Sequence, residues 1–189
     1  MVKREDYAYV LDVIPPEQML IKDPSLIKKG GFPRNEAYVQ AIGEQFFTLL
    51  ELTLKPNVTA EVGERVYIGS GTRDKVNKIV RRINYDELTN EAKNALPEVV
   101  AKIVKAQESK FVDFFNKAGP ITLKMHSLEL LRGGIGKKTL WQILEERRKK
   151  SFQSFEDIKS RVGIDPEKLI IDRILRELQG ADQYRIFVS

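Results

Sequence analysis

The chain has 189 residues, of which 42% are apolar, with no cysteine, a single histidine and a formal net charge of +5. The lack of cysteine excludes disulfides, thiolate metal sites and cysteine nucleophiles, and one histidine excludes a metal site built from several. The length suits one large domain or two small ones, and the apolar content suits ordinary globular cores.

Residues 1–88 are predicted to form a small antiparallel β-barrel. Short runs of β-branched and aromatic residues are separated by glycine, proline and asparagine, which is typical of strands joined by turns. Their number and length fit an OB-like (oligonucleotide-binding) barrel, although strand number alone does not separate it from an SH3-like barrel. The expected strands lie at residues 7–13, 38–42, 46–54, 58–68 and 75–83.

Two segments of this region, residues 28–35 and 69–75, combine glycine with basic residues and are expected to be loops. Their cations could contact nucleic acid, and an aromatic ring in the first could stack on an exposed base. An ordinary solvated loop is the competing interpretation. The secondary contacts expected here are Lys28, Lys29, Phe32, Arg34 and Arg73.

The pattern becomes helical at Thr89, which can cap a helix. Pro97 is unfavourable inside a helix and favourable in a first turn, so one helix should end before it and another begin there. Apolar residues then recur at helical spacing through residues 99–104 and 111–115, as expected for core. Residues 89–120 are therefore expected to connect the barrel to a C-terminal unit.

Residues 121–180 are expected to form an all-α unit of two pairs of helices. Residues 128–144 read as an apolar stretch, a Gly-Gly-Ile-Gly turn, two lysines and a threonine, and a second apolar stretch. In the second pair, Ser154 starts a capping-box pattern, and Asp165 precedes a proline as at a helix start. Residues 181–189 are a tail in which residues 184–188 alternate as in a short strand.

The first turn has the chemistry of a phosphate site. Its glycines allow a tight turn and leave the backbone bare. The first N–H groups of the next helix lack intrahelical partners and lie at its positive end, where anions bind. Such contacts carry no base information, so little sequence preference is expected. The expected binding residues are Arg132, Gly133, Gly134, Ile135, Gly136, Lys137, Lys138 and Thr139.

The distribution of charge favours the same region. Residues 119–161 carry ten Lys/Arg and five Asp/Glu, whereas residues 1–90 carry equal numbers of both. Clustered positive charge is typical of a polyanion binder. A solvated basic helix end and a glycine turn that only ends a helix are the competing interpretations. Arg147 and Arg148 are expected to add secondary contacts.

Residues 122–178 resemble a tandem helix-hairpin-helix domain, as in DNA-repair, recombination and some RNA-associated proteins. The whole chain resembles an uncharacterised archaeal family that joins an OB-like N-terminal barrel to that tandem, which places it in the α+β class. The resemblance implies nucleic-acid binding, with RNA linked to translation or RNA processing favoured over DNA. The usual turn is Leu-Pro-Gly-Ile-Gly, but here Leu131 is followed by Arg-Gly-Gly-Ile-Gly, one residue longer and without the proline.

The second hairpin is predicted to be structural. Asp165 lies where a phosphate would have to approach, and its carboxylate would cap the helix and repel an anion. Trp141 lies beside the apolar stripe of the first hairpin and is expected to pack against the second helix pair. His126 is expected to be a packed or surface histidine.

An enzyme is not expected. A P-loop would need glycine at Leu131 and serine or threonine at Lys138. By resemblance to base-excision glycosylases, Lys138 and Asp157 have a suitable separation, but Asp157 falls in the capping-box pattern. Two further alternatives are a DNA repair or recombination accessory protein and a scaffold that dimerises through its hairpins. No cofactor, metal or membrane partner is expected, and the absence of a long apolar run or signal peptide favours the cytoplasm.

Overall fold

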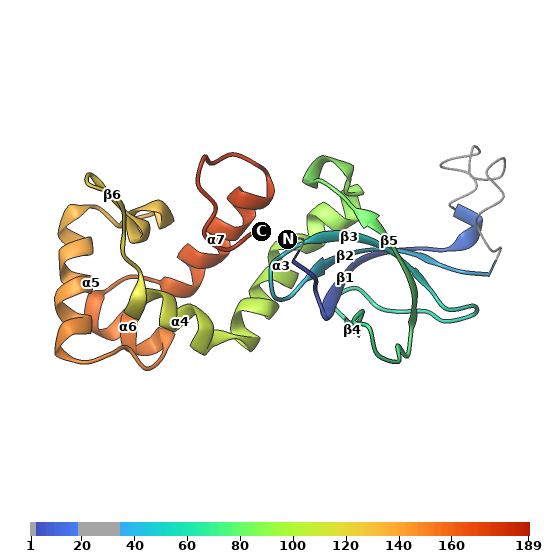
Figure 1. Ribbon diagram of the computed structural model, residues 1–189, viewed down its shortest axis with the longest axis horizontal. Helices are drawn as coiled ribbons and strands as arrows, with labels where there is room; N and C mark the ends of the chain where they lie inside the picture. The colour runs from blue at the N-terminus through green and yellow to red at the C-terminus, as the bar shows by residue number, and fades with distance from the viewer. Residues whose placement is uncertain (1–2, 19–34) are drawn as a thin grey trace. The chain divides into compact units, whose positions relative to one another are not determined.

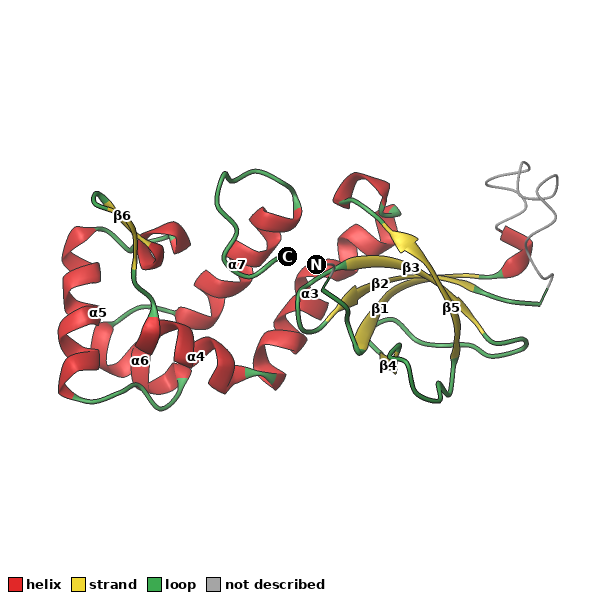
Figure 2. Cartoon of the chain, viewed as in Figure 1, coloured by secondary structure: helices red, strands yellow, loops and turns green. Residues whose placement is uncertain are grey.

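The computed structural model describes residues 3–18 and 35–189. It divides into two compact units, Met1–Val99 with Phe187–Ser189, and Val100–Ile186. The fold is mixed α+β, and most strands belong to the first unit whereas most helices belong to the second (Figure 2). Within the described ranges, no helix has the length and apolarity needed to cross a membrane.

The first unit is a curled five-stranded antiparallel sheet with the order β4-β1-β2-β3-β5 (Figure 1). Each expected strand is confirmed, although the run at residues 58–68 contributes only the three residues of β4. The sheet is a half-barrel, because β4 and β5 run in the same direction and do not pair within the described residues. The strands are β1 Tyr7–Ile14, β2 Tyr38–Gly43, β3 Leu49–Leu54, β4 Arg65–Tyr67 and β5 Val76–Arg82.

Register shifts accompany the curl of this sheet. The β1–β2 ladder shifts between Val10 and Asp12, and the β3–β5 ladder shifts twice. Bulges of this kind bend a strand and increase its twist. The curled sheet encloses an apolar core whose buried members include Ala8, Val10, Val39, Ala41, Leu50, Leu52, Leu54, Val66, Ile68 and Val76.

Beyond the short 3-10 helix η1 (Tyr85–Glu87), helix α3 runs without interruption over Asn90–Ala106. Thr89 caps it as expected, since its hydroxyl accepts the Ala92 N–H at 3.0 Å. The predicted break at Pro97 is wrong, because Pro97 lies inside α3. Proline inside a helix lacks an N–H donor and destabilises the fold by about 3 kcal/mol. Burial of each apolar side chain of the stripe stabilises it by about 1.5–3 kcal/mol, so several of them together outweigh Pro97. That stripe comprises Leu96, Val99, Val100, Ile103 and Val104.

The second unit is not purely helical, so that part of the prediction is wrong. Gly119 and Pro120 end α4 and a two-stranded hairpin follows, with the Ser127 N–H donating to the Gly119 carbonyl at 3.0 Å. The apolar stretch before the glycine turn forms a 3-10 helix, which has only five residues between its N-cap His126 and its C-cap Arg132. The elements are α4 Glu108–Lys117, β6 Pro120–Thr122, β7 Met125–His126, η2 Ser127–Leu131, α5 Lys137–Lys149, α6 Phe155–Val162 and α7 Pro166–Leu178.

The C-terminal tail forms no strand, contrary to the alternation of residues 184–188. Its backbone groups are bound by side chains of α7 instead. The buried Arg173 donates to the Tyr184 carbonyl, and the Ile186 N–H donates to the Glu177 carboxylate at 2.9 Å. These two backbone groups are therefore not available for pairing at a sheet edge.

Candidate nucleic-acid interface

The turn between η2 and α5 has a backbone that favours glycine. Arg132, Gly133 and Gly134 have φ angles of 56°, 57° and 108°. Glycine adopts such angles readily, but Arg132 combines its φ with a ψ of −148°, a region that non-glycine residues enter only under strain. Ile135, expected among the binding residues, has a buried side chain, and its N–H donates to the Arg132 carbonyl at 3.2 Å. The residue added to the usual turn is thus accommodated by strain at Arg132.

Helix α5 begins without a side-chain cap. Gly136 is its N-cap, and the N–H groups of Lys137, Lys138 and Thr139 have no hydrogen-bond partner among the described residues. A Cβ added at Gly136 would meet no atom within 4 Å, and its φ of −92° does not require glycine. Neither conformation nor internal packing explains this glycine, and a bare N-cap leaves room for an external anion.

The next two helices have side-chain caps at their N-termini, whereas α5 has none. The Ser154 hydroxyl accepts the Asp157 N–H at 3.0 Å, which caps α6. The Asp165 carboxylate accepts the Lys168 N–H at 3.2 Å, which confirms the predicted cap of α7. The N-terminus of α5 is therefore the one in this hairpin pair that can receive a ligand's oxygen atoms.

The two lysines at the start of α5 have different surroundings. The Lys137 ammonium is 3.0 Å from Glu129 Oε1 and 3.3 Å from the Lys124 carbonyl. This hydrogen bond and the His126 N–H hold the pKa of the Glu129 carboxyl below its ordinary value. Lys138 is exposed and has no partner among the described residues. Lys138 is consequently the cation that an approaching phosphate would meet first.

Two arginines predicted to contact nucleic acid, Arg132 and Arg147, make internal contacts in the structure. The Arg132 guanidinium is 3.0 Å from Asp182 Oδ1 and joins the turn to the C-terminal tail. Arg147 Nη1 donates to the Phe115 and Ala118 carbonyls at 3.2 and 2.7 Å, so it binds the C-terminal end of α4. These structural roles depend on residues 29 or more positions away, which no local pattern reveals.

The residues predicted to make secondary contacts belong to different parts of the chain. Arg148 is exposed on α5 and has no partner in the described part of the chain. Arg73 belongs to the first unit, where its guanidinium donates to the Gly69 and Asn77 carbonyls at 2.9 and 3.3 Å. The other secondary contacts, Lys28, Lys29, Phe32 and Arg34, lie outside the described residues.

The turns of the two hairpins lie side by side. Gly134 and Thr139 of the first turn line the same cavity of about 460 Å³ as Gly163 and Asp165 of the second. Lys168 and Asp172 also line this cavity, so its wall carries charges of both signs. Gly136 and Lys138 do not belong to the lining.

Trp141 does not pack against the second helix pair, so that prediction is wrong. Its side chain is 66% exposed, because Leu140 and Ile143 occupy the buried face of α5 and Trp141 lies beside that face. It follows Lys137 and Lys138 by four and three residues, the spacing of neighbours on one helix surface. The periodicity of α5 could have indicated this exposure, whereas nothing in the sequence marked Leu123, fully exposed at the tip between β6 and β7.

His126 gives this region a pH dependence. Its Nδ1 accepts the Leu128 N–H at 3.2 Å and caps η2, an interaction that a protonated imidazole cannot make. Burial, and then the charge of Arg147, lower the pKa of His126 from its ordinary value of 6.5. As the pH falls, the unfolded chain takes up this proton first, so the stabilisation is present above about pH 6.5 and is lost below it.

We expect His126→Asn to remove this part of the pH dependence, because asparagine caps a helix without titrating. The measurement is the free energy of unfolding in denaturant from about pH 7.5 to 5.5. Equal slopes of stability against pH in the two proteins would contradict the role of His126.

Comparison with known proteins identifies relatives along the whole chain. A family model described as "Protein of unknown function (DUF655)" matches residues 4–189. The "Uncharacterized protein MJ0038" of Methanocaldococcus jannaschii is 45% identical over 191 residues, covering 99% of this chain and 81% of that protein. The crystal structure of Af1531 from Archaeoglobus fulgidus, also described as DUF655, has a TM-score of 0.83 and 47% identity, covering 98% of this chain and 100% of that one.

Proposed function

We propose nucleic-acid binding as the function of this chain, which belongs to the DUF655 family of uncharacterised archaeal proteins. In this proposal the N-terminus of α5 binds the phosphate backbone, with RNA favoured over DNA and little sequence preference. The second unit is interpreted as a tandem helix-hairpin-helix and the half-barrel as a relative of the OB fold. We propose a cytoplasmic, non-catalytic protein of translation or RNA processing.

One observation carries this proposal: α5 begins at a bare glycine, and neither its first three N–H groups nor the neighbouring Lys138 ammonium has a partner within the described residues. Unpaired N–H groups at a helix N-terminus, together with the helix dipole, favour an anion. The helices that follow α5 both carry side-chain caps, Ser154 on α6 and Asp165 on α7, whereas α5 has none.

Intrinsic fluorescence offers a direct test, because Trp141 is the chain's single tryptophan and lies one turn from Lys137. We expect single-stranded RNA of mixed sequence to change its emission on binding. For four phosphate contacts, the logarithm of the binding constant should fall against the logarithm of salt concentration with a slope of about −2.8 to −3.6.

Replacing Lys137 and Lys138 together by glutamate should weaken binding to every sequence alike. Lys138→Glu alone should cause most of this loss, because Lys137 already pairs with Glu129. Lys159→Glu makes the same charge change on α6 and is the matched control. Wild-type binding of both RNA and DNA by the double variant would refute the assignment.

A second candidate is an interaction scaffold, which the exposed apolar side chains favour. Trp141 and Leu123 are 66% and 108% exposed, and Ile121 is 38% exposed. Exposed apolar groups on a small unit are typical of protein contact surfaces. Self-association that is insensitive to salt and abolished by Trp141→Ser, measured by sedimentation, would support the scaffold.

A further inference from the structure

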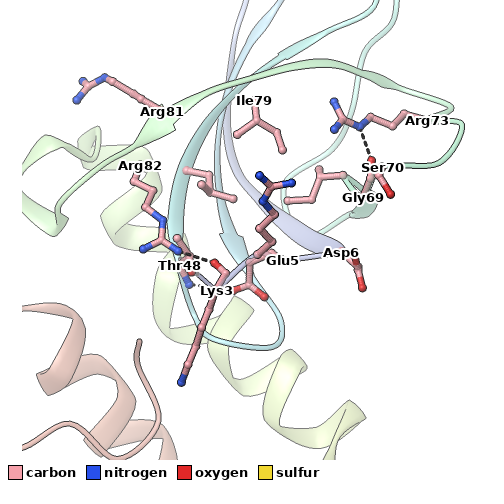
Figure 3. A pocket seen from close by; sticks show the side chains of 13 residues that line it. Lys3, Glu5, Asp6, Thr48, Gly69, Ser70, Arg73, Ile79, Arg81 and Arg82 are labelled. Atoms are coloured by element: carbon pink, nitrogen blue, oxygen red, sulfur yellow. Dashed lines mark hydrogen bonds between the residues drawn. The ribbon is translucent and has the colours of Figure 1, made fainter. Parts of the chain in front are cut away.

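A cavity of about 460 Å³ in the first unit is not used by the proposed function (Figure 3). It lies between the N-terminal segment, the start of β3, the segment after β4, and β5. A cavity of this size is in the range that holds a small molecule such as a nucleotide. Its cationic lining residues are Lys3, Arg4, Arg73, Arg81 and Arg82, and its apolar ones are Leu50, Ile68 and Ile79.

Three of the arginines keep guanidinium nitrogens for a ligand. Arg4 has no partner among the described residues. Arg82 uses one nitrogen, Nη2, to donate to the Lys3 carbonyl at 2.6 Å, and Arg73 uses two for backbone carbonyls. The last two side chains are therefore positioned by the fold while still offering N–H groups. Arg81 differs, because Glu51 and Glu87 already bind its guanidinium.

The acidic residues of the lining do little to cancel this charge. Glu5 is buried, and its carboxylate accepts the backbone N–H groups of Gln45, Phe46 and Thr48 at 2.9–3.1 Å. Those dipoles compensate its charge. Asp6 is exposed to solvent, which screens it. The cavity therefore favours an anion, and the planar fork of arginine matches phosphate oxygens.

One further feature indicates more than a bare anion. Ile79 is 40% exposed within this cationic lining, in the same wall as the buried Leu50 and Ile68. An apolar surface beside cations suits a ligand that carries both a phosphate and an apolar face.

We infer that this cavity binds a phosphorylated nucleotide, with its phosphate on Arg4, its base or ribose against Ile79, and Arg73 and Arg82 as further cations of the wall. The ligand is either a free nucleotide or the 5′-phosphorylated end of an RNA chain, which present the same chemistry. The site is separate from α5, and its occupation does not depend on the hairpin.

The test uses the full chain labelled with ¹³C at isoleucine δ-methyl groups and carrying Lys137→Glu and Lys138→Glu, which removes the hairpin's contribution. AMP and 5′-phosphorylated pentauridylate are the two probes, with adenosine and 5′-hydroxyl pentauridylate as their phosphate-free counterparts. We expect a saturable shift of the Ile79 methyl signal with a phosphorylated probe. Saturation by AMP identifies a free nucleotide, and saturation by the pentauridylate alone identifies an RNA end.

Arg4→Glu should weaken this binding about tenfold or more, since it removes charge-assisted hydrogen bonds. Lys78→Glu, one residue before Ile79 and outside the lining, is the matched control and should change affinity by less than about twofold. The inference is overturned if neither phosphorylated probe shifts Ile79, if the phosphate-free probes bind equally well, or if the two variants weaken binding alike. None of these results bears on the hairpin.

Discussion

Replacing Arg173 by alanine is expected to lower the free energy of unfolding by about 3–5 kcal/mol, as breaking a buried ion pair does. The Arg173 side chain is fully buried, with Nε donating to Glu177 Oε2 at 2.8 Å. Its other nitrogens donate to the Leu130 carbonyl at 2.9 Å and to the Tyr184 carbonyl. Alanine would bury the Glu177 carboxylate without its guanidinium and would remove one of the contacts that hold η2 and one of those that hold the tail to α7.

Denaturant unfolding followed by circular dichroism measures this loss. Arg185→Ala, in the tail but exposed and without a partner among the described residues, is the control and should change stability by about 0.5 kcal/mol or less. Replacing Arg173 by methionine together with Glu177 by leucine should recover part of the loss, because no buried charge remains unpaired. Equal effects of Arg173→Ala and Arg185→Ala would show that the buried network contributes nothing.

Gly136→Asp should abolish most nucleic-acid binding while leaving the protein as stable or slightly more stable. An aspartate N-cap stabilises a helix by a few tenths of a kcal/mol relative to glycine. Its carboxylate would occupy the N–H groups of α5 as Asp165 occupies those of α7. Hydrogen bonds to a charged group contribute about 1.5–3 kcal/mol, so affinity should fall about tenfold to a hundredfold.

Opposite changes in stability and affinity distinguish a binding site from a structural glycine. Gly119→Asp is the matched control, because it makes the same charge change in the same unit and its Cβ would also meet no atom within 4 Å. Trp141 fluorescence reports binding and thermal unfolding reports stability. If both variants weaken binding equally, the effect is one of net charge and the proposed site is wrong.

Local features of this protein were predictable from short stretches of sequence. The five strands, the cap at Thr89 and the cap at Asp165 depend on residues within a few positions of each other. The exposure of Trp141 was predictable in the same way, because the helical spacing of Leu140 and Ile143 places Trp141 beside the buried face of α5. Pro97 shows the limit of local rules, because burial of the apolar stripe of α3 outweighed an unfavourable residue.

The availability of charges was decided by contacts between distant parts of the chain. The sequence placed Arg132, Lys137 and Arg147 beside one turn, but it did not show that Asp182, Glu129 and two carbonyls would bind them. The cavity of the first unit likewise brings together Arg4, which precedes the first strand, and Arg82 at the end of β5.

The sequence by itself determined where strands, turns and helix caps form, since these depend on backbone preferences and neighbouring side chains. The tertiary structure alone decided which polar groups remain unpaired, and among the described candidate residues it left Lys138, Arg148 and the first N–H groups of α5 without partners. The physical reason is that the partners of a charged group come from anywhere in the chain, so only the folded structure shows which of its hydrogen bonds are already made.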